Sequence, residues 1–435
     1  MQEKRPGIWR RAMNLIKRTA RTGRIDPSDR ARLVSMCRLY GLAIARAVGI
    51  DDWMRPKVEP ASALADVFIW AVIDWHFRTQ RPQHLASALA RRGHRVFYIS
   101  NNFVDSATPG FAAEALDERG RLFQINLYVS GAPEIYSNLA SPEQAKEIMK
   151  SLAALLQWTR TCKPISLIQH PYWFELAQRL PSAQLFYDCM DHHGGFENNS
   201  TSVLRAEQAL IEACDVLVVT SQWLYDRLAT QARTTLLIRN ATEYEHFSAK
   251  PKKWFRDRLS RKVIGYYGAI AEWFDVELVH RISQEHPDAL VLLVGRDTVC
   301  ARERLIDTPN VLMPGEVPYA ELPYWLHGFD VCILPFRVTP LTLATNPVKV
   351  YEYLSAGKPV ITVDLPEMAQ FDGLVTLARN SDEFSGAVTA TLARSTNEQA
   401  DVEARQEFAA RQTWAHRASE LTAAIGHTTS NIGNT

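Results

Sequence analysis

The stretch TNPVKVYEYLSAGKPVI, residues 345–361, predicts a helix that leads into a buried strand. Asn346 is a residue type that caps helices, Pro347 suits a first turn, and Gly357 would end the helix before the apolar residues PVI. Lys349 then falls in the first turn, where the helix macrodipole disfavours a cation by about 0.3 kcal/mol or more. An anion bound at this end of the helix would explain the lysine.

Glu352 follows Lys349 by three positions, on the same helical face. Its carboxylate could accept hydrogen bonds from the paired hydroxyls of a sugar. The alternative is an ordinary Lys–Glu pair within the helix, worth only about 0.2–0.5 kcal/mol, and this order of the two charges is the less favourable one. The residues alone leave both interpretations open.

Outward from this stretch, short apolar runs alternate with helix-like segments. The runs are continuous, as expected for parallel strands covered on both faces. The rhythm occurs twice, before and after a charged segment at residues 250–262, and indicates an α/β protein with two facing Rossmann-like doubly wound domains. The expected strands are 66–73, 95–100, 164–169, 183–188, 215–221 and 235–240, then 263–268, 289–295, 311–315, 330–336 and 358–364.

The length of 435 residues also indicates more than one domain, because a usual domain has about 100–200 residues. The division that we expect is a basic helical arm at residues 1–60, Rossmann-like domains at 61–250 and 251–400, and a last helix at 401–425 that crosses back to the first domain.

Composition and charge narrow the class of protein. With 46% hydrophobic and 22% charged residues, the chain is typical of globular proteins. The net charge of +1 combines +9 on residues 1–50 with −8 on the rest, which favours a surface contact of the arm over a nucleic-acid-binding protein. The six cysteines form no C-x-x-C pair, which argues against a zinc site or a disulfide frame and fits a reducing cytoplasm.

Targeting signals are weak. No apolar run approaches the roughly 20 residues of a membrane span. The basic N-terminus has no apolar stretch after it, so it does not resemble a secretory signal. We therefore expect a cytoplasmic enzyme or binding protein.

Two loops after first-half strands carry candidate chemistry, because ligands of such sheets collect at the carboxyl ends of strands. Arg81 and His84 open a helix after the strand at 66–73; they line the cleft or only cap the helix. Asp188, Asp191 and His192 follow the strand at 183–188 and suit general-base work or hydroxyl binding.

The second cluster has other interpretations. The residues DCMDHH, 188–193, could be a metal site, since carboxylates and imidazoles are metal ligands. Asp188 alone could instead cap a neighbouring helix. The residues leave these alternatives open.

The second half repeats the pattern. Gly265 and Gly268 allow a tight turn into a helix whose amides could face a phosphate, and Arg296 follows the next strand. Together with Lys349 they indicate a pocket for a diphosphate. Asn240 follows the last first-half strand, where a plain interdomain loop is the alternative.

At this point the chain resembles a known family, the bacterial GT-B glycosyltransferases of the large group-one, retaining class that builds surface polysaccharides. The resemblance spans about residues 65–425. The motifs that carry it, in the family's order, are RPQHLASALARRGHRVFYIS, FYDCMDHH, ACDVLVVTSQWL, RNATEYEHF, GYYGAIAEWFDVELV, PYAELPYWLHGFDVCILPF and, most specific of all, NPVKVYEYLSAGKPVI.

The resemblance implies a role for each half of the chain. Residues 61–250 would bind the acceptor, with Arg81 and His84 on that side, and Asp191 or His192 would lie near the family's catalytic-site histidine. Residues 251–400 would bind the nucleotide-sugar: Glu352 would hold its ribose and Lys349 its diphosphate. Gly268 would lie beside the diphosphate, and the other donor-side residues would be Asn240, Arg296 and Asn346.

Two departures from the family pattern concern the donor. Many members have a further glutamate eight positions before Glu352, where this chain has Ala344. Many also have an arginine and a lysine after the glycine turn, where this chain has AIAEWFD. The phosphate charge must then be met by Lys349, Arg296 and helix amides, and the sugar and the stereochemical course are left open.

Cations and helix amides can stabilise a leaving diphosphate without a metal. We therefore expect no cofactor and no metal, with the nucleotide-diphosphate sugar as substrate and a glycan or lipid-linked acceptor. If the anomeric configuration is inverted, Asp191 or Asp188 becomes the base. The rival functions are a sugar-nucleotide epimerase, which needs no acceptor, and a non-catalytic protein that binds a sugar or a partner.

The basic arm has a possible membrane role. Among its arginines are the apolar residues Ile8, Trp9, Met13, Leu15 and Ile16. An interfacial helix on anionic lipid at the inner face of the plasma membrane would bring the enzyme to a lipid-linked acceptor. A solvated helix or one packed on a partner is the alternative.

Overall fold

The structure is a computed structural model that describes residues 27–61, 63–136, 138–162, 164–180, 184–195, 199–394 and 399–432. It divides into two compact units. The first comprises the described residues up to Thr220, Leu224–Leu237 and those from Leu421 onward; the second comprises Ser221–Trp223 and Ile238–Glu420. The division falls after Leu237, so the charged segment at 250–262 lies inside the second unit and does not link the two.

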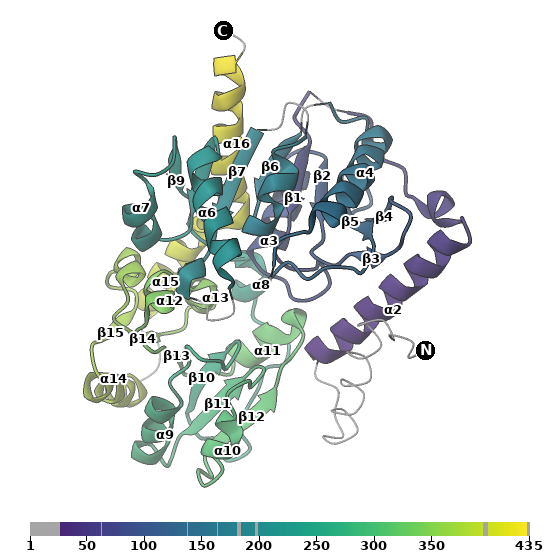
Figure 1. The fold of residues 1–435 in the computed structure, drawn as a ribbon. Coiled ribbons are helices and arrows are strands. Elements are labelled where there is room, and N and C mark those ends of the chain that lie inside the picture. The colour runs from purple at the N-terminus through teal and green to yellow at the C-terminus, as the bar shows by residue number, and fades with distance from the viewer. Residues whose placement is uncertain are drawn as a thin grey trace. The chain divides into compact units, whose positions relative to one another are not determined.

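The first unit is built on a nine-stranded sheet with the order β3-β5-β2-β1-β6-β7-β8-β9, in which β4 pairs with β5 (Figure 1). Among the described residues, only the pairing of β4 with β5 is antiparallel. The strands are β1 Val67–Trp70, β2 Val96–Ile99, β3 Val104–Asp105, β4 Phe111–Ala115, β5 Leu122–Val129, β6 Ile165–Ile168, β7 Gln184–Cys189, β8 Val216–Val219 and β9 Thr235–Leu237.

Helices connect these strands. They are α2 Pro27–Ala47, η1 Asp51–Met54, α3 Arg81–Arg91, α4 Pro142–Thr159, η2 Pro171–Trp173, α5 Phe174–Ala177, η3 His193–Gly195, α6 Thr201–Ala213 and α7 Gln222–Leu228. The start of α3 follows from its sequence, because Gln80 and Gln83 form a capping box and Pro82 stands in the first turn.

The second unit has a six-stranded, all-parallel sheet in the order β12-β11-β10-β13-β14-β15. The strands are β10 Val263–Tyr267, β11 Leu290–Val294, β12 Val311–Gly315, β13 Val331–Leu334, β14 Val360–Val363 and β15 Thr376–Ala378. The helices are α8 Tyr244–Ser248, α9 Val276–Glu285, α10 Ala301–Arg304, η4 Tyr319–Glu321, α11 Leu322–Leu326, α12 Pro340–Leu343, α13 Val348–Ser355, η5 Pro366–Phe371, α14 Ser381–Ala393 and α15 Gln399–Arg411. The last helix, α16 Trp414–Ile432, begins in this unit, and its residues from Leu421 onward belong to the first unit.

Both sheets are doubly wound, as predicted. The chain runs outward from β1 through β2 and returns to β6 on the other side of β1. In the second sheet it runs from β10 through β11 to β12 and returns to β13 beside β10. The order of the strands therefore reverses next to β1 and next to β10, and ligands of such sheets bind at the carboxyl ends of strands at these points.

The eleven predicted strands are all present, and all except β9 and β12 are buried along most of their length. The prediction missed four strands of the described residues: β3, β4, β5 and β15. The eight residues of β5, LFQINLYV, are all buried, but Gln124 and Asn126 interrupt the apolar run. The predicted last helix, 401–425, is in fact two helices, α15 and α16, with Thr413 in a bridge to Thr242 between them.

The helix predicted within residues 345–361 is α13, and two details of its start are wrong. It begins at Val348 with Pro347 as the capping residue, and Asn346 caps nothing. Its end is confirmed: Gly357 follows the last turn with φ of +69°, in the left-handed region that glycine adopts at little cost.

Candidate functional site

Two glycines, Gly268 and Gly295, allow the backbones at the carboxyl ends of β10 and β11 to approach each other closely. The Gly268 N–H donates to the Val294 carbonyl at 2.9 Å, and Gly268 has a φ of +135°. A Cβ atom on Gly295 would lie 1.8 Å from the Gly268 carbonyl oxygen, so only glycine fits there. The loops after the two strands continue together, because the Ile270 N–H donates to the Arg296 carbonyl at 2.9 Å.

Lys349 reaches this glycine turn from the first turn of α13. A Cβ atom on Gly268 would lie 2.0 Å from Lys349 Cε and 2.8 Å from Nζ, so the ammonium group rests against the glycine. The structure thus brings Gly268 and Lys349 together at one sheet edge, with the half-exposed Arg296 following Gly295. A cation beside exposed backbone at a strand end is suited to hold a phosphate.

Glu352 lies one turn further along α13 and is 5% exposed. Burial raises its pKa to about 7, while a hydrogen bond from Tyr267 and the charge of Lys349 pull the pKa down. The Tyr267 hydroxyl donates to Glu352 Oε2 at 2.7 Å. The side chain is therefore a buried carboxyl group with a pKa near neutral pH. The hydrogen bond from the Tyr267 hydroxyl holds it in one orientation.

The sequence interpretation missed Tyr267. It is the last residue of β10, and its N–H donates to the Tyr353 hydroxyl at 3.1 Å, so β10 and α13 are joined by two tyrosines. The available signal was the polar aromatic pair YY at the end of an otherwise apolar strand, next to the glycine turn.

Two asparagines predicted to touch the donor bind each other. The Asn240 N–H donates to Asn346 Oδ1 at 2.8 Å, and Asn240 Nδ2 donates to the Asn346 carbonyl at 2.6 Å. Asn346 Nδ2 donates in turn to the buried Glu367 at 3.1 Å. These bonds fix the loop after β9 to the residues before α13, which makes both asparagines positioning groups for Lys349; contact with a donor stays a prediction.

Two predictions about the glycine turn are wrong. Gly265 lies inside β10 and makes no turn: a Cβ atom there would lie 2.1 Å from the Phe329 ring, so glycine is needed for packing. No helix opens directly after Gly268 either. The next helix, α9, begins at Val276, and the Asp275 side chain already accepts from the Leu278 N–H at its start.

In the first unit, Arg81 and Asp188 form a buried ion pair. Arg81 donates from Nε at 3.1 Å and from Nη2 at 2.7 Å to Asp188 Oδ1, and the two side chains are 4% and 1% exposed. Gln169 Nε2 donates to Asp188 Oδ2 at 3.3 Å. Asp188 therefore anchors the first residue of α3 to the end of β7, and its role as a base stays a prediction.

Asp191 and His192 follow this pair and are partly exposed. Burial raises the pKa of Asp191 to about 6, with Arg81 lowering it and Asp188 raising it. Burial and the charge of Arg227 lower the pKa of His192. A carboxyl group with a raised pKa next to an imidazole with a lowered pKa is suited to exchange protons with a hydroxyl.

His170 is a neighbour that sequence reasoning missed. It follows β6, and its ring lies 5.4 Å from that of His193, centroid to centroid. Burial lowers the pKa of His170 to about 3 and that of His193 to about 4, so both rings are neutral at pH 7. The signal was the motif IQHPYW, a histidine directly after an apolar strand.

His84 is buried in the first turn of α3.

Metal binding was an alternative for residues 188–193. Among the residues that the structure describes, no group of three or more His, Cys, Asp or Glu side chains is arranged to hold a metal ion. Likewise, none of the described helices is both long enough and apolar enough to cross a membrane.

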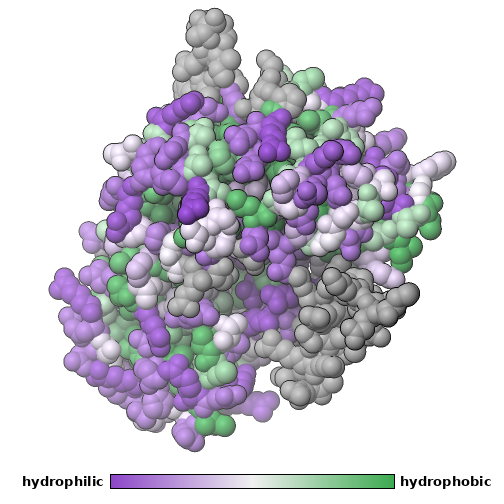
Figure 2. All heavy atoms as spheres, viewed as in Figure 1, coloured by the Kyte–Doolittle hydropathy of each residue, from purple (hydrophilic) through white to green (hydrophobic). Residues whose placement is uncertain are grey.

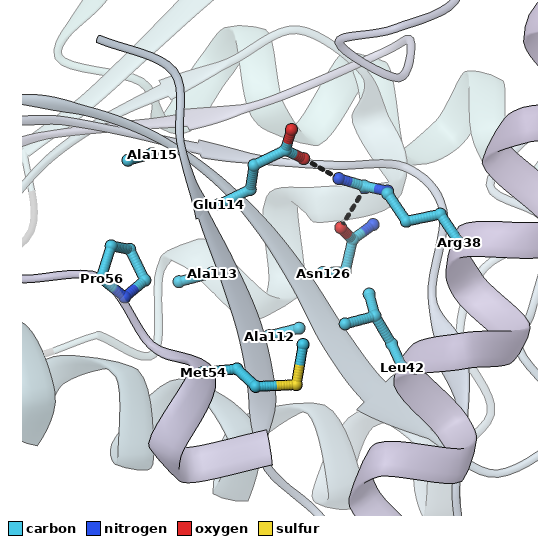
Figure 3. A pocket seen from close by; sticks show the side chains of 9 residues that line it. All are labelled: Arg38, Leu42, Met54, Pro56, Ala112, Ala113, Glu114, Ala115 and Asn126. Atoms are coloured by element: carbon cyan, nitrogen blue, oxygen red, sulfur yellow. Dashed lines mark hydrogen bonds and ion pairs between the residues drawn. The ribbon is translucent and has the colours of Figure 1, made fainter. Parts of the chain in front are cut away.

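A cavity of about 340 Å³ lies elsewhere in the first unit, between α2, η1 and β4 (Figure 3). Arg38 reaches into it from α2 and pairs with Glu114, and Arg38 Nη2 donates to Asn126 Oδ1 at 2.6 Å. The charges at this end largely neutralise each other, so the rest of the wall sets the character of the cavity. That wall is apolar and consists of Leu42, Met54, Pro56, Ala112, Ala113 and Ala115.

Comparison with known proteins finds a family that matches part of the second unit. The family described as glycosyl transferases group 1 matches residues 261–394, which include Gly268, Arg296, Asn346, Lys349 and Glu352. The chain is 28% identical over 206 residues to the putative teichuronic acid biosynthesis glycosyltransferase TuaH of Bacillus subtilis (strain 168), over 43% of this chain and 52% of that protein. It thus spans about half the length of this curated relative.

Solved structures share the fold over most of the chain. Sucrose-phosphate synthase from Thermosynechococcus elongatus aligns with a TM-score of 0.61 at 16% identity, over 84% of this chain and 96% of that one. Starch synthase IV from Arabidopsis thaliana aligns with a TM-score of 0.62 at 12% identity, over 85% and 100%. The chain therefore has the GT-B fold of two Rossmann-like domains, and residues 261–394 of its second unit match the group 1 glycosyltransferases.

Proposed function

We propose that this chain transfers a sugar from a nucleotide-diphosphate sugar to a glycan or lipid-linked acceptor in the synthesis of a cell-surface polysaccharide. The observation that carries the proposal is the contact of the Lys349 side chain with Gly268 at the end of β10. Support comes from the group 1 match over residues 261–394 and from a relative whose name assigns it to teichuronic acid biosynthesis.

The second unit supplies the electrostatics of the leaving group. As the bond between the sugar and the diphosphate breaks, negative charge grows on the phosphate oxygens, and a fixed ammonium group stabilises it. Lys349 is placed for this role, with Arg296 as a second cation at the same sheet edge. Glu352, once ionised, accepts hydrogen bonds from the ribose hydroxyls.

The first unit supplies the acceptor side. Asp191, with a pKa raised to about 6, and His192, with a lowered pKa, receive the acceptor proton or position its hydroxyl. Retention of the anomeric configuration needs no protein nucleophile by the family pattern; inversion would make Asp191 the base. Analysis of the product anomer by NMR separates the two courses.

The first test is a thermal-shift panel with UDP, GDP, dTDP and their sugars. A nucleotide at about 100 times its dissociation constant stabilises the folded protein by about 2.7 kcal/mol. We expect one nucleotide to raise the melting temperature of the wild type and to have no effect on Glu352→Ala. A lack of any shift across the panel would overturn the proposal and favour a non-catalytic protein, for which the buried Ala344 in place of the family's first glutamate is an argument.

Three further features belong to the proposal. Transfer proceeds without a metal, so activity survives EDTA. The protein acts in the cytoplasm, at the inner face of the plasma membrane. The basic residues 1–50 contact anionic lipid there, although the part that precedes Pro27, with Trp9 and its apolar neighbours, lies outside the described residues. Turnover of the nucleotide-sugar without an acceptor would instead favour an epimerase.

A further inference from the structure

Helix α2 has apolar residues on two opposite sides. One side packs on the first unit, where Leu39 and Ala45 are buried, and Leu39 joins a small core with Val104 and Tyr128. This contact accounts for one side only. An apolar helix face that stays uncovered is an exception that needs a partner or a lipid surface.

The opposite side is exposed. Val34, Tyr40 and Ile44 are 58%, 50% and 48% exposed, and their spacing of six and four residues keeps them on one arc of the helix. Val48, directly after the end of the helix, is 64% exposed. From Val34 to Ile44 this arc is about 15 Å long, at 1.5 Å per residue. We call the exposed apolar set that continues into η1 the outer face; it consists of Val34, Cys37, Tyr40, Ile44, Val48, Ile50, Trp53 and Met54.

Trp53 is the most exposed residue of the outer face, with 90% of its surface open. An indole ring with an apolar body and an N–H group is enriched at the boundary between water and lipid. Figure 2 shows hydrophobic side chains at the right-hand edge of the molecule, in the region where α2 ends.

The charges around the outer face suit an anionic surface. Of the three aspartates in α2 and η1, Asp29 and Asp51 are buried, and Asp52 pairs with Arg55 at 2.6 Å. The chain that leads into α2, residues 1–26, has eight Lys/Arg and two Asp/Glu residues. An apolar face that follows a strongly basic segment is the pattern of a helix that lies in the interface of an anionic bilayer.

The cavity behind α2 favours lipid over a folded protein as the occupant. Met54 belongs to both features: it is 59% exposed on the outer face and also lines the cavity. A flexible acyl chain that lies on the face therefore has access to an apolar space lined by three alanines.

We propose that the outer face of α2 and η1 is a lipid-binding surface that seats the first unit on an anionic bilayer, with Trp53 and Met54 in the interfacial layer. This inference names the residues that make the membrane contact of the proposed function, and its biological role depends on that function. Its own test is independent of sugar transfer, because lipid binding is measured without any donor or acceptor.

The test measures partition of the full chain onto vesicles of phosphatidylcholine with one quarter phosphatidylglycerol. Ile44→Asp places a charge at the centre of the outer face, and Ile306→Asp makes the same change at a 76% exposed isoleucine of the second unit. We expect Ile44→Asp to weaken binding at least tenfold and Ile306→Asp to leave it unchanged, with melting temperatures of both variants equal to that of the wild type.

A second measurement places Trp53 directly. Vesicles with brominated acyl chains quench tryptophan that enters the bilayer, and the chain has 11 tryptophans, so the loss of quenching in Trp53→Phe isolates this one. Unchanged quenching in Trp53→Phe, or wild-type binding by Ile44→Asp with binding lost only on deletion of residues 1–26, would overturn the proposal. So would a dimer in light scattering that Ile44→Asp converts to a monomer, since the face would then bind a second copy.

Discussion

The two sheets of this protein present charged groups at equivalent edges, but the groups are used differently. At the end of β7 in the first unit, Asp188 is bound by Arg81 and Gln169 and is 1% exposed. At the end of β10 in the second unit, Lys349 rests against the backbone of Gly268, where any side chain would collide with it.

The difference separates structural charges from candidate ligand-binding charges. A buried pair that satisfies itself holds two segments together, and its loss leaves an uncompensated charge. A cation that rests against a glycine turn lies beside backbone that can bind an anion. By this criterion the carboxyl end of β10 is a better-defined candidate site than the carboxyl end of β7.

Breaking the Arg81–Asp188 pair has the largest expected effect. Arg81→Ala leaves Asp188 buried without its main partner, which should lower the free energy of unfolding by about 3–5 kcal/mol. Urea unfolding followed by circular dichroism measures it.

The control is a double variant, Arg81→Met with Asp188→Leu, which removes both charges and should recover most of the loss. If Asp188→Asn keeps wild-type stability and abolishes turnover, Asp188 is a base and the comparison between the two edges fails.

Much of the fold was predictable because continuous apolar runs mark buried parallel strands. The runs at 263–268 and 289–295 became β10 and β11 with boundaries moved by one residue. Strand β5 was not predictable in this way. Its residues Gln124 and Asn126 are buried because they bond to each other and to Asp74 and the Asn102 carbonyl, and no local pattern reveals those distant partners.

The candidate site was predictable where one side chain acts at a strand end or a helix start, as with Lys349, Gly268 and Glu352. It was not predictable where a partner from another element decides the role. Asn346 is a residue type that often caps helices. In the structure its side chain instead accepts from the Asn240 N–H and donates to Glu367. Tyr267 matters because its hydroxyl donates to Glu352, and that contact depends on where α13 places Glu352.

The next effect concerns the donor end. Lys349→Gln should weaken nucleotide-diphosphate binding by about 1.5–3 kcal/mol, because a charge-assisted hydrogen bond to phosphate is lost, while the unliganded protein keeps its stability. Isothermal titration calorimetry measures the affinity. Lys262→Gln is the matched control, since Lys262 is a 46% exposed lysine that pairs with Asp330 at the opposite end of β10. Equal nucleotide-diphosphate affinities of the two variants would show that Lys349 does not bind the diphosphate.

Glu352 should make stability and binding depend on pH in opposite directions. Its folded pKa, about 7, is raised above the usual value, so the folded protein holds this proton more tightly than the unfolded chain. Stability from this group is complete below pH 4 and falls as the pH rises to 7, by at most about 1.4 kcal/mol per unit. Nucleotide affinity should rise over the same range as the carboxylate forms.

The measurement is unfolding at several pH values for wild type and Glu352→Gln. The difference between them isolates Glu352, because Asp191 and Glu207 also have raised pKa values and remain in both proteins. Parallel pH profiles would show that Glu352 is already ionised in the folded protein.

The smallest expected effect belongs to Tyr267→Phe, which removes one hydroxyl and no charge. The lost hydrogen bond should cost about 1 kcal/mol of stability. Because the Tyr267 hydroxyl lowers the pKa of Glu352, its removal should also move the rise in nucleotide affinity to higher pH. Tyr353→Phe, at the tyrosine that accepts from the Tyr267 N–H, serves as the control and should cost stability without this displacement. A profile that stays in place in both variants would mean that Glu352 titrates independently of Tyr267, and the tyrosine would then only hold β10 to α13.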